Sequence, residues 1–205
     1  IKAMKKSSIL ILIIICLVGC KKGSNETTIT GEIKGLGTDT LYLYGMDELY
    51  DRIDTIYVEN DKFSYTTSVD TITSAYLLLK NRIEYPVFLD KGNKIKIKGD
   101  TINLNFLTIS GNIYNEEFTD FQKALEDPAD PSEKAGEETV DKRITVEKAN
   151  TAEEMAEEFI LQHHSSYVSL YLLDKYFVQK ETPDFSKIKK LVEVMTGVLQ
   201  DKPYI

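Results

Sequence analysis

The sequence has only two histidines and two cysteines among its 205 residues, and it has no tryptophan. Two cysteines are too few for a disulfide-stabilised scaffold or for a zinc site built from cysteines alone. The two histidines, His163 and His164, are adjacent in the chain, which leaves few residues for a histidine-based active site. The composition therefore favours a protein without catalytic activity.

Positive charge is also scarce, with 25 lysines and arginines against 33 aspartates and glutamates and a formal net charge of −8. A nucleic-acid binder needs a basic stripe that displaces counterions, so this balance argues against nucleic acid as a partner. Hydrophobic residues make up 42% of the chain and charged residues 28%. This composition supports a packed core, in one medium domain or two small ones.

The motifs of common active sites are missing. The sequence has no Gly-x-Gly-x-x-Gly or Walker loop for nucleotides, no His-Glu-x-x-His for zinc and no Gly-x-Ser-x-Gly nucleophile elbow. It has no EF-hand spacing for calcium and no Cys-x-x-Cys pair for redox chemistry. The sequence therefore predicts no catalytic residue, no cofactor and no metal, and we expect a protein that is not an enzyme.

The N-terminus has the layout of a secretory signal peptide. Lys5 and Lys6 precede an apolar run over residues 9–18. A short apolar run after positive charge is typical of such a signal, and ten residues are far fewer than the ~20 that a membrane-spanning helix requires. We therefore expect residues 1–19 to direct the chain out of the cytoplasm.

The apolar run ends in Leu17-Val18-Gly19-Cys20, which resembles the lipobox of bacterial lipoproteins. In that family the signal peptidase cuts before the cysteine, whose thiol becomes diacylglyceryl-modified. The resemblance implies lipidation of Cys20, with palmitate among the acyl chains. Several acyl chains hold a protein stably at a bilayer, whereas one chain would be marginal.

This processing would leave a mature chain of 186 residues with a net charge of −11, because three lysines leave with the signal. Cys16 would leave as well and Cys20 would be blocked, so no free thiol would remain. Residues 20–27 would form the lipidated cysteine and a short polar tether. We expect a membrane-anchored lipoprotein of the bacterial cell envelope that faces the periplasm.

Residues 28–112 show the period-two alternation of short β-strands. The clearest case is Ile95 and Ile97, which alternate with lysines. Similar patterns occur around Ile29–Ile33, Leu41–Tyr44, Arg52–Val58, Lys62–Val69, Ser74–Lys80, Glu84–Asp90 and Leu104–Ser110. In the last segment the apolar phase slips, which predicts a β-bulge. About eight strands at this spacing predict an antiparallel β-sandwich or barrel-like domain.

Residues 113–205 are predicted to form a helical connector region of three to four helices, which makes the fold class α+β. Apolar residues recur at helical spacing in three stretches: Tyr114, Phe118, Phe121 and Leu125; Met155, Phe159 and His163; and Phe185, Ile188, Val192, Met195 and Leu199. Between the second and third stretches, Ser165 or Ser166 is a candidate N-cap for a helix from Tyr167 to about Phe177, and Ser165 is the favoured one.

Two polar clusters invite a functional interpretation. The pair His163-His164 with the serines that follow suggests a nucleophile or a metal site, but adjacent helical residues point about 100° apart. We favour packing of His163 beside Phe159. Acidic residues could gather a calcium ion at Asp47, Glu48, Asp51 and Asp54. Because no glycine turns this segment, a solvated loop is the favoured interpretation.

A row of lysines is the third polar feature, at Lys91, Lys94, Lys96 and Lys98. These lysines could meet anionic lipid headgroups or an acidic partner. Lysines on an edge strand, where they prevent aggregation, are the favoured explanation.

Several segments of the β-rich region are familiar in their order and spacing. They are Ile29–Ile33, Asp39–Tyr44, Ile53–Thr55, Asn60–Tyr65, Phe88–Ile97, Ile109–Gly111 and Asn115–Phe118. Together they resemble the domain of unknown function 4369, over roughly residues 27–120. That domain stands at the front of many lipid-anchored thiol–disulfide oxidoreductases of the TlpA/ResA and AhpC/TSA type.

The resemblance implies a helical connector followed by a thioredoxin-fold domain with a Cys-x-x-Cys dithiol. The sequence ends at Ile205, where that domain would begin, so none of the family's catalytic residues can be placed. We therefore expect a non-catalytic lipid-anchored module for binding, positioning or dimerisation, with the membrane and a protein partner or second copy as its contacts. Two alternatives are an N-terminal fragment of an oxidoreductase and a ligand-binding lipoprotein with a Tyr-lined sheet cleft.

Overall fold

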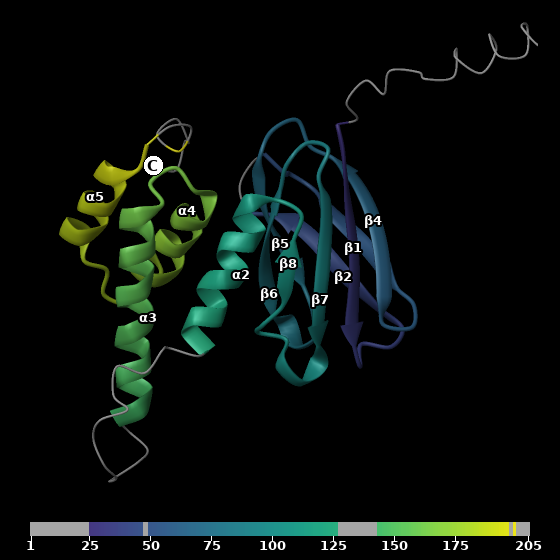
Figure 1. Ribbon diagram of the computed structural model, residues 1–205, viewed down its shortest axis with the longest axis horizontal. Helices are drawn as coiled ribbons and strands as arrows, with labels where there is room; N and C mark the ends of the chain where they lie inside the picture. Colours follow the sequence, from purple (N-terminus) through teal and green to yellow (C-terminus); the bar gives the residue numbers. More distant parts are fainter. Residues whose placement is uncertain (1–24, 47–48, 127–142, 197–198, 200–205) are drawn as a thin grey trace, which may run out of the picture.

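Eight strands form two four-stranded sheets in the computed structural model, which describes residues 25–46, 49–126, 143–196 and 199 (Figure 1). The strands are β1 (Glu26–Lys34), β2 (Asp39–Gly45), β3 (Ile53–Val58), β4 (Lys62–Ser68), β5 (Thr73–Leu78), β6 (Glu84–Leu89), β7 (Lys94–Asp100) and β8 (Thr108–Ser110). Their positions follow the predicted segments closely, because most strands bury one of their two alternating faces, whereas β6 is buried on both. The α+β class with an N-terminal sandwich is confirmed.

The strand order is β4-β1-β7-β8 in the first sheet, called sheet A, and β3-β2-β5-β6 in the second, called sheet B. Every pairing is antiparallel except that of β1 with β7, which is parallel and sets Thr28 beside Lys94. The period of a sequence reveals which face of a strand is buried but not which strand lies next to it, so this pairing was not predicted. It makes β7 an interior strand of sheet A.

The core lies between the two sheets. The alternating residues Ile29, Ile33, Leu41, Leu43 and Ile95 are completely buried, as the period-two pattern predicts. Burying an aliphatic side chain of this size stabilises the fold by about 1.5–3 kcal/mol relative to exposure. The period-two pattern of the sequence therefore identifies these core residues correctly.

Phe63 fills a space in the core that a missing side chain leaves open. Its ring lies where a β-carbon on Gly31 would stand, with the nearest ring atom only 2.1 Å from that position. Gly31 and Phe63 are opposite each other in the β1–β4 register. A glycine is required here because any side chain would displace the ring.

The last strand differs from its prediction. Only Thr108–Ser110 forms a strand, and a short 3-10 turn, η2 (Thr101–Asn103), precedes it. Asp100 caps this turn by accepting a hydrogen bond from Ile102 N at 2.9 Å. Leu104 is buried from within the loop, so the slip in apolar phase marks the end of a turn and not a bulge.

Helix α2 (Ile113–Glu126) covers one open side of the sandwich, where β6 and β8 are the outermost strands (Figure 1). The buried Asn115 accepts a hydrogen bond from Phe88 N at 3.0 Å and donates one to Phe88 O at 2.8 Å. Thr119 Oγ1 bonds Ile109 N and Ile109 O, each at 3.0 Å. The two side chains thereby replace the missing neighbour strands of β6 and β8.

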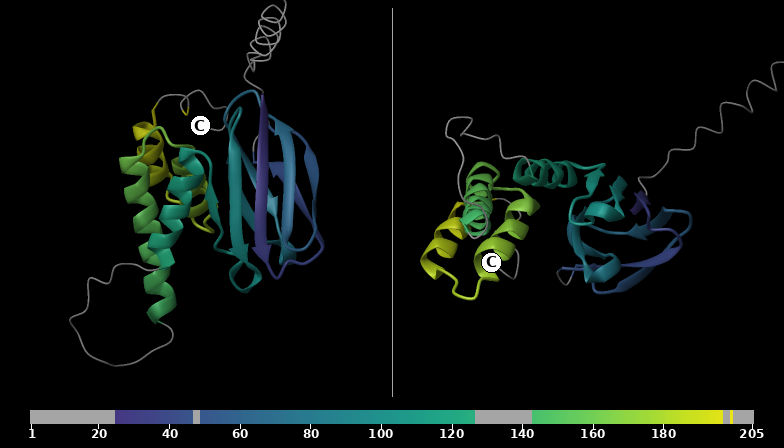
Figure 2. Two further views of the ribbon diagram at one scale, coloured as in Figure 1. Left: turned by 45° about the vertical axis from the view of Figure 1, so that its right-hand side comes forward. Right: turned by 90° about the horizontal axis from the view of Figure 1, so that it is seen from below.

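The remaining helices gather beside α2, and one of them also contacts sheet B (Figure 2). They are α3 (Arg143–Gln162), α4 (Tyr167–Leu173), a π-helical turn η3 (Asp174–Val178) and α5 (Phe185–Val194). Edge-to-face aromatic pairs connect them to α2 and sheet B, at Phe118–Tyr171, Phe121–Phe159, Tyr114–Tyr167 and Tyr76–Tyr171. Lys187 of α5 forms an ion pair with Glu157 of α3, and Lys180, which precedes α5, forms one with Glu153 of α3. These ion pairs fasten the C-terminal segment to α3.

Two details of the helical prediction are corrected. The N-cap of α4 is Ser166, which accepts a hydrogen bond from Val168 N at 3.1 Å, and not Ser165. The last helix ends at Val194, and its first apolar residue, Phe185, is 76% exposed. Phe185 is the first residue of α5, directly after the cap Asp184, where its side chain can point away from α3.

Candidate functional site

The outer face of sheet B presents exposed aromatic and apolar side chains on β2 and β3. Ile53 and Tyr57 are each 73% exposed, and Tyr42 of the neighbouring strand is 41% exposed. The register places Tyr42 opposite Thr55, between the other two. We call Tyr42, Ile53, Thr55 and Tyr57 the Tyr–Ile face. Large exposed apolar side chains that cluster on one sheet face make that face a candidate interaction surface.

A shallow, open hollow of about 470 Å³ borders this face, where the loop after β2 leads into β3. Its lining includes Tyr44, Tyr50, Arg52 and Ile53. The Arg52 guanidinium lies over the Tyr50 ring, 4.6 Å from its centroid. The hollow is the part of the described chain that corresponds to the predicted Tyr-lined cleft.

Beneath the hollow, a polar network joins the edges of the two sheets. Tyr50 donates a hydrogen bond to Asp54 of β3 and contacts Thr67 of β4. Arg52 Nε lies 3.1 Å from Asp54 Oδ2, and Arg52 Nη2 donates to Ser68 O at 3.2 Å. The network closes the side of the sandwich opposite α2.

Within this network the pKa of Asp54 is set by opposing effects. Partial burial raises it, whereas hydrogen bonds from Tyr50 and Tyr65 and the charge of Arg52 lower it, and the net result lies below the ordinary value of 3.8. Burial and the bond to Asp54 raise the pKa of Tyr50 to about 12. Asp54 is therefore a carboxylate with protein donors around it, which differs from the calcium ligand that the acidic cluster suggested.

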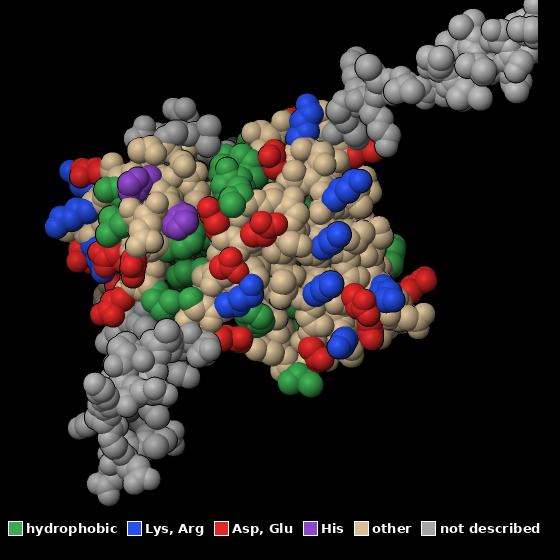
Figure 3. Space-filling view, in the orientation of Figure 1, with side chains coloured by type: hydrophobic (Ala, Val, Ile, Leu, Met, Phe, Trp, Pro, Cys, Tyr) green, Lys and Arg blue, Asp and Glu red, His purple; other side chains and the backbone are tan. Residues whose placement is uncertain are grey.

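The outer face of sheet A has different chemistry. Lys94, Lys96 and Lys98 of β7 are exposed there, and Figure 3 shows basic side chains in a line along this face. We call these three residues the lysine face. The favoured explanation from the sequence, protection of an edge strand, is wrong, because β7 lies between β1 and β8.

Two open hollows flank Lys98 on this sheet, with volumes of about 520 and 370 Å³. Both are lined by Glu32 and Lys98. Lys34 and Asp100 contribute to the larger one, and Lys62 contributes to the smaller one. The surface around the lysine face is therefore hollowed and rich in amino groups.

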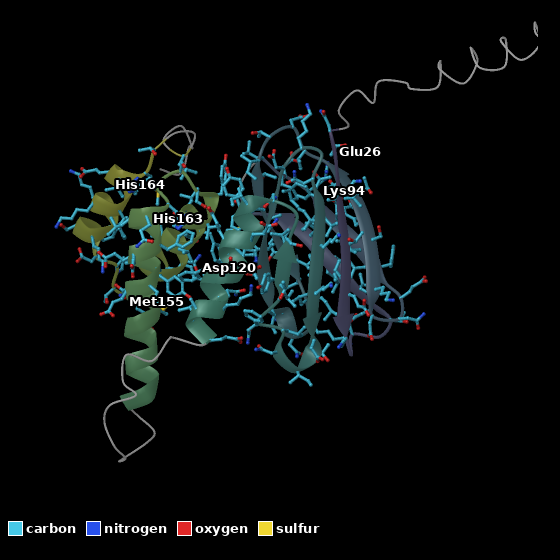
Figure 4. All side chains as sticks on the ribbon, viewed as in Figure 1. Glu26, Lys94, Asp120, Met155, His163 and His164 are labelled. Carbon is cyan, nitrogen blue, oxygen red and sulfur yellow. The ribbon has the colours of Figure 1, made fainter. Side chains whose placement is uncertain are left out.

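The histidine pair lies at the end of α3, where His163 contacts residues of α2 and α3 (Figure 4). His163 stacks on Phe159 with ring centroids 4.1 Å apart, as favoured from the sequence, and its Nδ1 lies 3.5 Å from Glu117 Oε1. Ser166 Oγ donates to the other oxygen of Glu117 at 2.5 Å. Glu117 therefore joins α2 to the turn between α3 and α4.

The predicted lipidation site, Cys20, lies outside the described residues, as do Cys16, Asp47 and Glu48. Among the residues that the structure describes, no group of three histidine, cysteine or acidic side chains is placed to hold a metal ion. None of the described helices is long and apolar enough to cross a membrane.

Sequence reasoning missed Asn115 and Thr119, whose polar side chains face the sandwich. The signal was present, because two polar residues at i and i+4 interrupt the apolar side of a helix, next to Phe118. It also missed Tyr50 and Arg52, whose roles depend on contacts with β4 that no local pattern encodes.

Comparison with known proteins agrees with this architecture. A family model described as "Domain of unknown function (DUF4369)" matches residues 27–118, from β1 into the first part of α2. The matched stretch includes both sheets and also Asn115, which bonds the edge of β6. No curated protein matches the chain. The β-sandwich with the first part of its covering helix is therefore the part of the chain that is similar to DUF4369.

Proposed function

We propose that this chain is a non-catalytic, lipid-anchored module of the bacterial cell envelope that pairs with a second copy of itself. Acyl chains on Cys20 hold it at the membrane, and the Tyr–Ile face of sheet B makes the protein contact. The role is to position a partner surface at a fixed place near the membrane. The observation that carries the proposal is the exposure of Ile53 and Tyr57, each 73%, on an edge strand.

The spacing on β3 supports self-pairing. Ile53 and Tyr57 lie symmetrically about Thr55, and all three are exposed in the alternation of the strand. Two β3 strands paired antiparallel about Thr55 would bring Ile53 of each copy beside Tyr57 of the second copy, with β-carbons about 5 Å apart. A two-fold contact of this kind is self-complementary and closed. The strand also carries no lysine or proline that would block edge pairing.

The hydrogen bonds and ion pairs of Asp54 and Glu117 support a role without catalysis. Asp54 is engaged by Tyr50 and Arg52, and Glu117 is engaged by His163 and Ser166. In each case the ionisable groups join separate segments of the fold. A general acid or base needs a proton acceptor or donor that remains available to a substrate.

A symmetric crosslink tests this function. In Thr55→Cys the new thiols would face each other across the two-fold axis, at a Cα distance that suits a disulfide. We expect mild oxidation of membranes containing this variant to give a covalent dimer, and we expect none from the wild type. Ser186→Cys, an exposed position on α5 outside both the Tyr–Ile face and the lysine face, is the matched control. Adding Ile53→Lys to Thr55→Cys should reduce the dimer at least fivefold.

The proposal fails if Thr55→Cys remains monomeric under conditions that oxidise both variants fully. Equal crosslinking of Thr55→Cys and Ser186→Cys would indicate random collision in the membrane and would contradict it as well.

The hollow beside Tyr50 favours a second candidate function, the binding of a small molecule such as a glycan. Its aromatic rings and the Arg52 guanidinium offer a stacking surface and hydrogen-bond donors. Titration with short oligosaccharides should then shift the NMR signals of Tyr44 and Tyr50 in the wild type. The same titration of Tyr44→Ser should show a weaker shift, and an unchanged response would rule out this hollow as the binding place.

A further inference from the structure

The lysine face of sheet A consists of like charges that form no ion pair among the residues that the structure describes. Lys94, Lys96 and Lys98 are exposed, and none of them makes an ion pair or side-chain hydrogen bond within the described residues. Successive residues of the row are two positions apart on one strand face, which separates their α-carbons by about 6.5–7 Å. At that distance, less than the Debye length of about 8 Å at physiological salt, the charges repel one another.

The neighbours of this row are mostly hydroxyl groups. The β1–β7 register sets Thr28, Thr30 and Glu32 beside the three lysines, and the β7–β8 register sets Ser110 and Thr108 beside Lys96 and Lys98. Glu32 is the single carboxylate in this set, and it forms no ion pair with Lys98 in the described part of the chain. Because β7 is an interior strand, protection of an edge does not explain the lysines.

The start of β1 relates this face to the N-terminus. β1 begins at Glu26, and Glu26 and Lys94 lie near the same end of sheet A (Figure 4). Cys20 precedes Glu26 by six residues, which span at most ~20 Å when fully extended. A lipid on Cys20 would therefore keep the Lys94 end of the sheet close to the bilayer surface.

We propose that the lysine face docks on an anionic phospholipid surface, with the amino groups of Lys94, Lys96 and Lys98 binding headgroup phosphates. Threonine and serine hydroxyls beside the row add hydrogen-bond donors for the same oxygens. The inference depends on the proposed lipid anchor for the nearness of the membrane, whereas the docking itself is electrostatic. It places the Tyr–Ile face of sheet B on the side away from the bilayer, where a second copy can reach it.

Lysine acetylation with a small water-soluble reagent tests the docking on the full chain. The chain is mixed with vesicles of neutral phosphatidylcholine or of phosphatidylcholine with 30% phosphatidylglycerol. We expect acetylation of Lys94, Lys96 and Lys98 to slow at least fivefold on the anionic vesicles, and we expect 0.5 M NaCl to restore it. Lys189 and Lys190 of α5, which are exposed, serve as internal controls and should react equally in both.

Charge variants give a second measurement. Each lysine near an anionic surface raises membrane partitioning about fivefold, so replacing all three residues of the lysine face by glutamine should lower binding to anionic vesicles about 100-fold at low salt. The control with Lys123, Lys189 and Lys190 replaced by glutamine carries the same change in net charge on the helical side. It should bind within a factor of three of the wild type.

Equal acetylation on neutral and anionic vesicles would overturn the proposal, and so would equal binding by the two triple variants. Protection of the lysine face by soluble polyglutamate, without protection by anionic vesicles, would assign the face to an acidic polypeptide and would also overturn it. Both assays compare vesicles that differ only in charge, so their outcome does not depend on acylation of Cys20. Failure of the docking and failure of the lipid anchor are therefore distinguishable.

Discussion

Tyr85 shows how one buried hydroxyl joins three segments of the sandwich. It donates a hydrogen bond to Leu107 O at 2.7 Å, accepts one from Leu107 N at 3.0 Å and contacts Gln122 of α2. Burial raises the pKa of this phenol well above its ordinary value of 10.0. Tyr57 of the same tyrosine-rich region is 73% exposed, whereas Tyr85 is 2% exposed.

Replacing Tyr85 by phenylalanine should therefore be costly. The ring would still fill its space, but the buried Leu107 N–H and C=O would both lose their partner, at a cost of about 1–3 kcal/mol. Urea unfolding of the purified chain measures this loss. Tyr57→Phe removes an exposed hydroxyl and should change the free energy of unfolding by less than about 0.5 kcal/mol. Equal effects of the two variants would contradict the structural role of Tyr85.

Asp54 makes stability depend on pH. Its pKa in the folded chain lies below the ordinary value of 3.8, so its contribution is complete above that pH and is lost as the pH falls through the lowered pKa. We expect Asp54→Asn to destabilise the fold by about 1–2 kcal/mol at pH 6, because the bonds of Tyr50 and Arg52 lose a charged acceptor. Below pH 3.8 the wild type and the variant should converge.

Asp51→Asn is the matched control for this pH series, because Asp51 is an exposed neighbour without a hydrogen bond or ion pair in the described residues. Its unfolding curve should follow the wild type from pH 7 to pH 3. A constant difference between Asp54→Asn and wild type over the whole range would show that the carboxylate charge is not what stabilises this edge.

Among the helices and strands, α2 makes the contacts that its sequence pattern predicts least. Its apolar spacing predicts a helix that packs on something, and the helix begins at Ile113 and ends at Glu126, just before Pro128. The pattern does not predict that Asn115 and Thr119 pair with the edges of two strands from different sheets. Edge strands need such protection, because their unpaired backbone groups attract other chains.

Asn115→Ala and Thr119→Val should expose different edges. The first removes both bonds to Phe88 and should speed hydrogen exchange of the Phe88 amide, whereas the second should speed exchange of the Ile109 amide. We expect each variant to lose about 1–3 kcal/mol of stability. Asn105→Ala, at an exposed loop position, is the control. If each variant accelerated both amides equally, α2 would act only by packing.

The strands themselves were largely predictable, and the reasons for the exceptions are physical. Ile95 and Ile97 alternate with lysines, so the face of β7 that is buried followed directly from the sequence. Its position inside sheet A did not, because the parallel partner β1 lies about 66 residues away in the chain. Protection of an edge strand by these lysines would require β7 to lie at the edge, so that prediction is wrong.

The whole molecule presents two faces of opposite chemistry on one rigid sandwich. Sheet A carries the lysine face, and sheet B carries the Tyr–Ile face. Large side chains of both faces are exposed, although α4 packs on the same side of sheet B at Tyr76. If Cys20 is acylated, as we propose, the molecule has a defined orientation with one face to the bilayer and the other toward a partner.

Cys20→Ser tests the lipid anchor on which that orientation depends. Cells that express the wild type in the presence of labelled palmitate should incorporate the label into the protein, and the variant should incorporate none, because the oxygen of serine cannot replace the sulfur of the lipobox cysteine. Cys16→Ser is the control, since that residue would leave with the signal, and it should keep the label in full. Label in Cys20→Ser, or its loss in Cys16→Ser, would contradict the lipobox assignment.

The parallel pair of β1 and β7 also imposes an order of assembly on the sandwich. All four strands of sheet B lie between β2 and β6 in the chain, with β4 of sheet A among them, so this sheet can form before β7 is available. β1, although it emerges first, must wait for β7 before its second neighbour exists, and closing so long a loop is slow. We therefore expect the first strand to remain vulnerable to proteases and chaperones for longer than any other part of the sandwich.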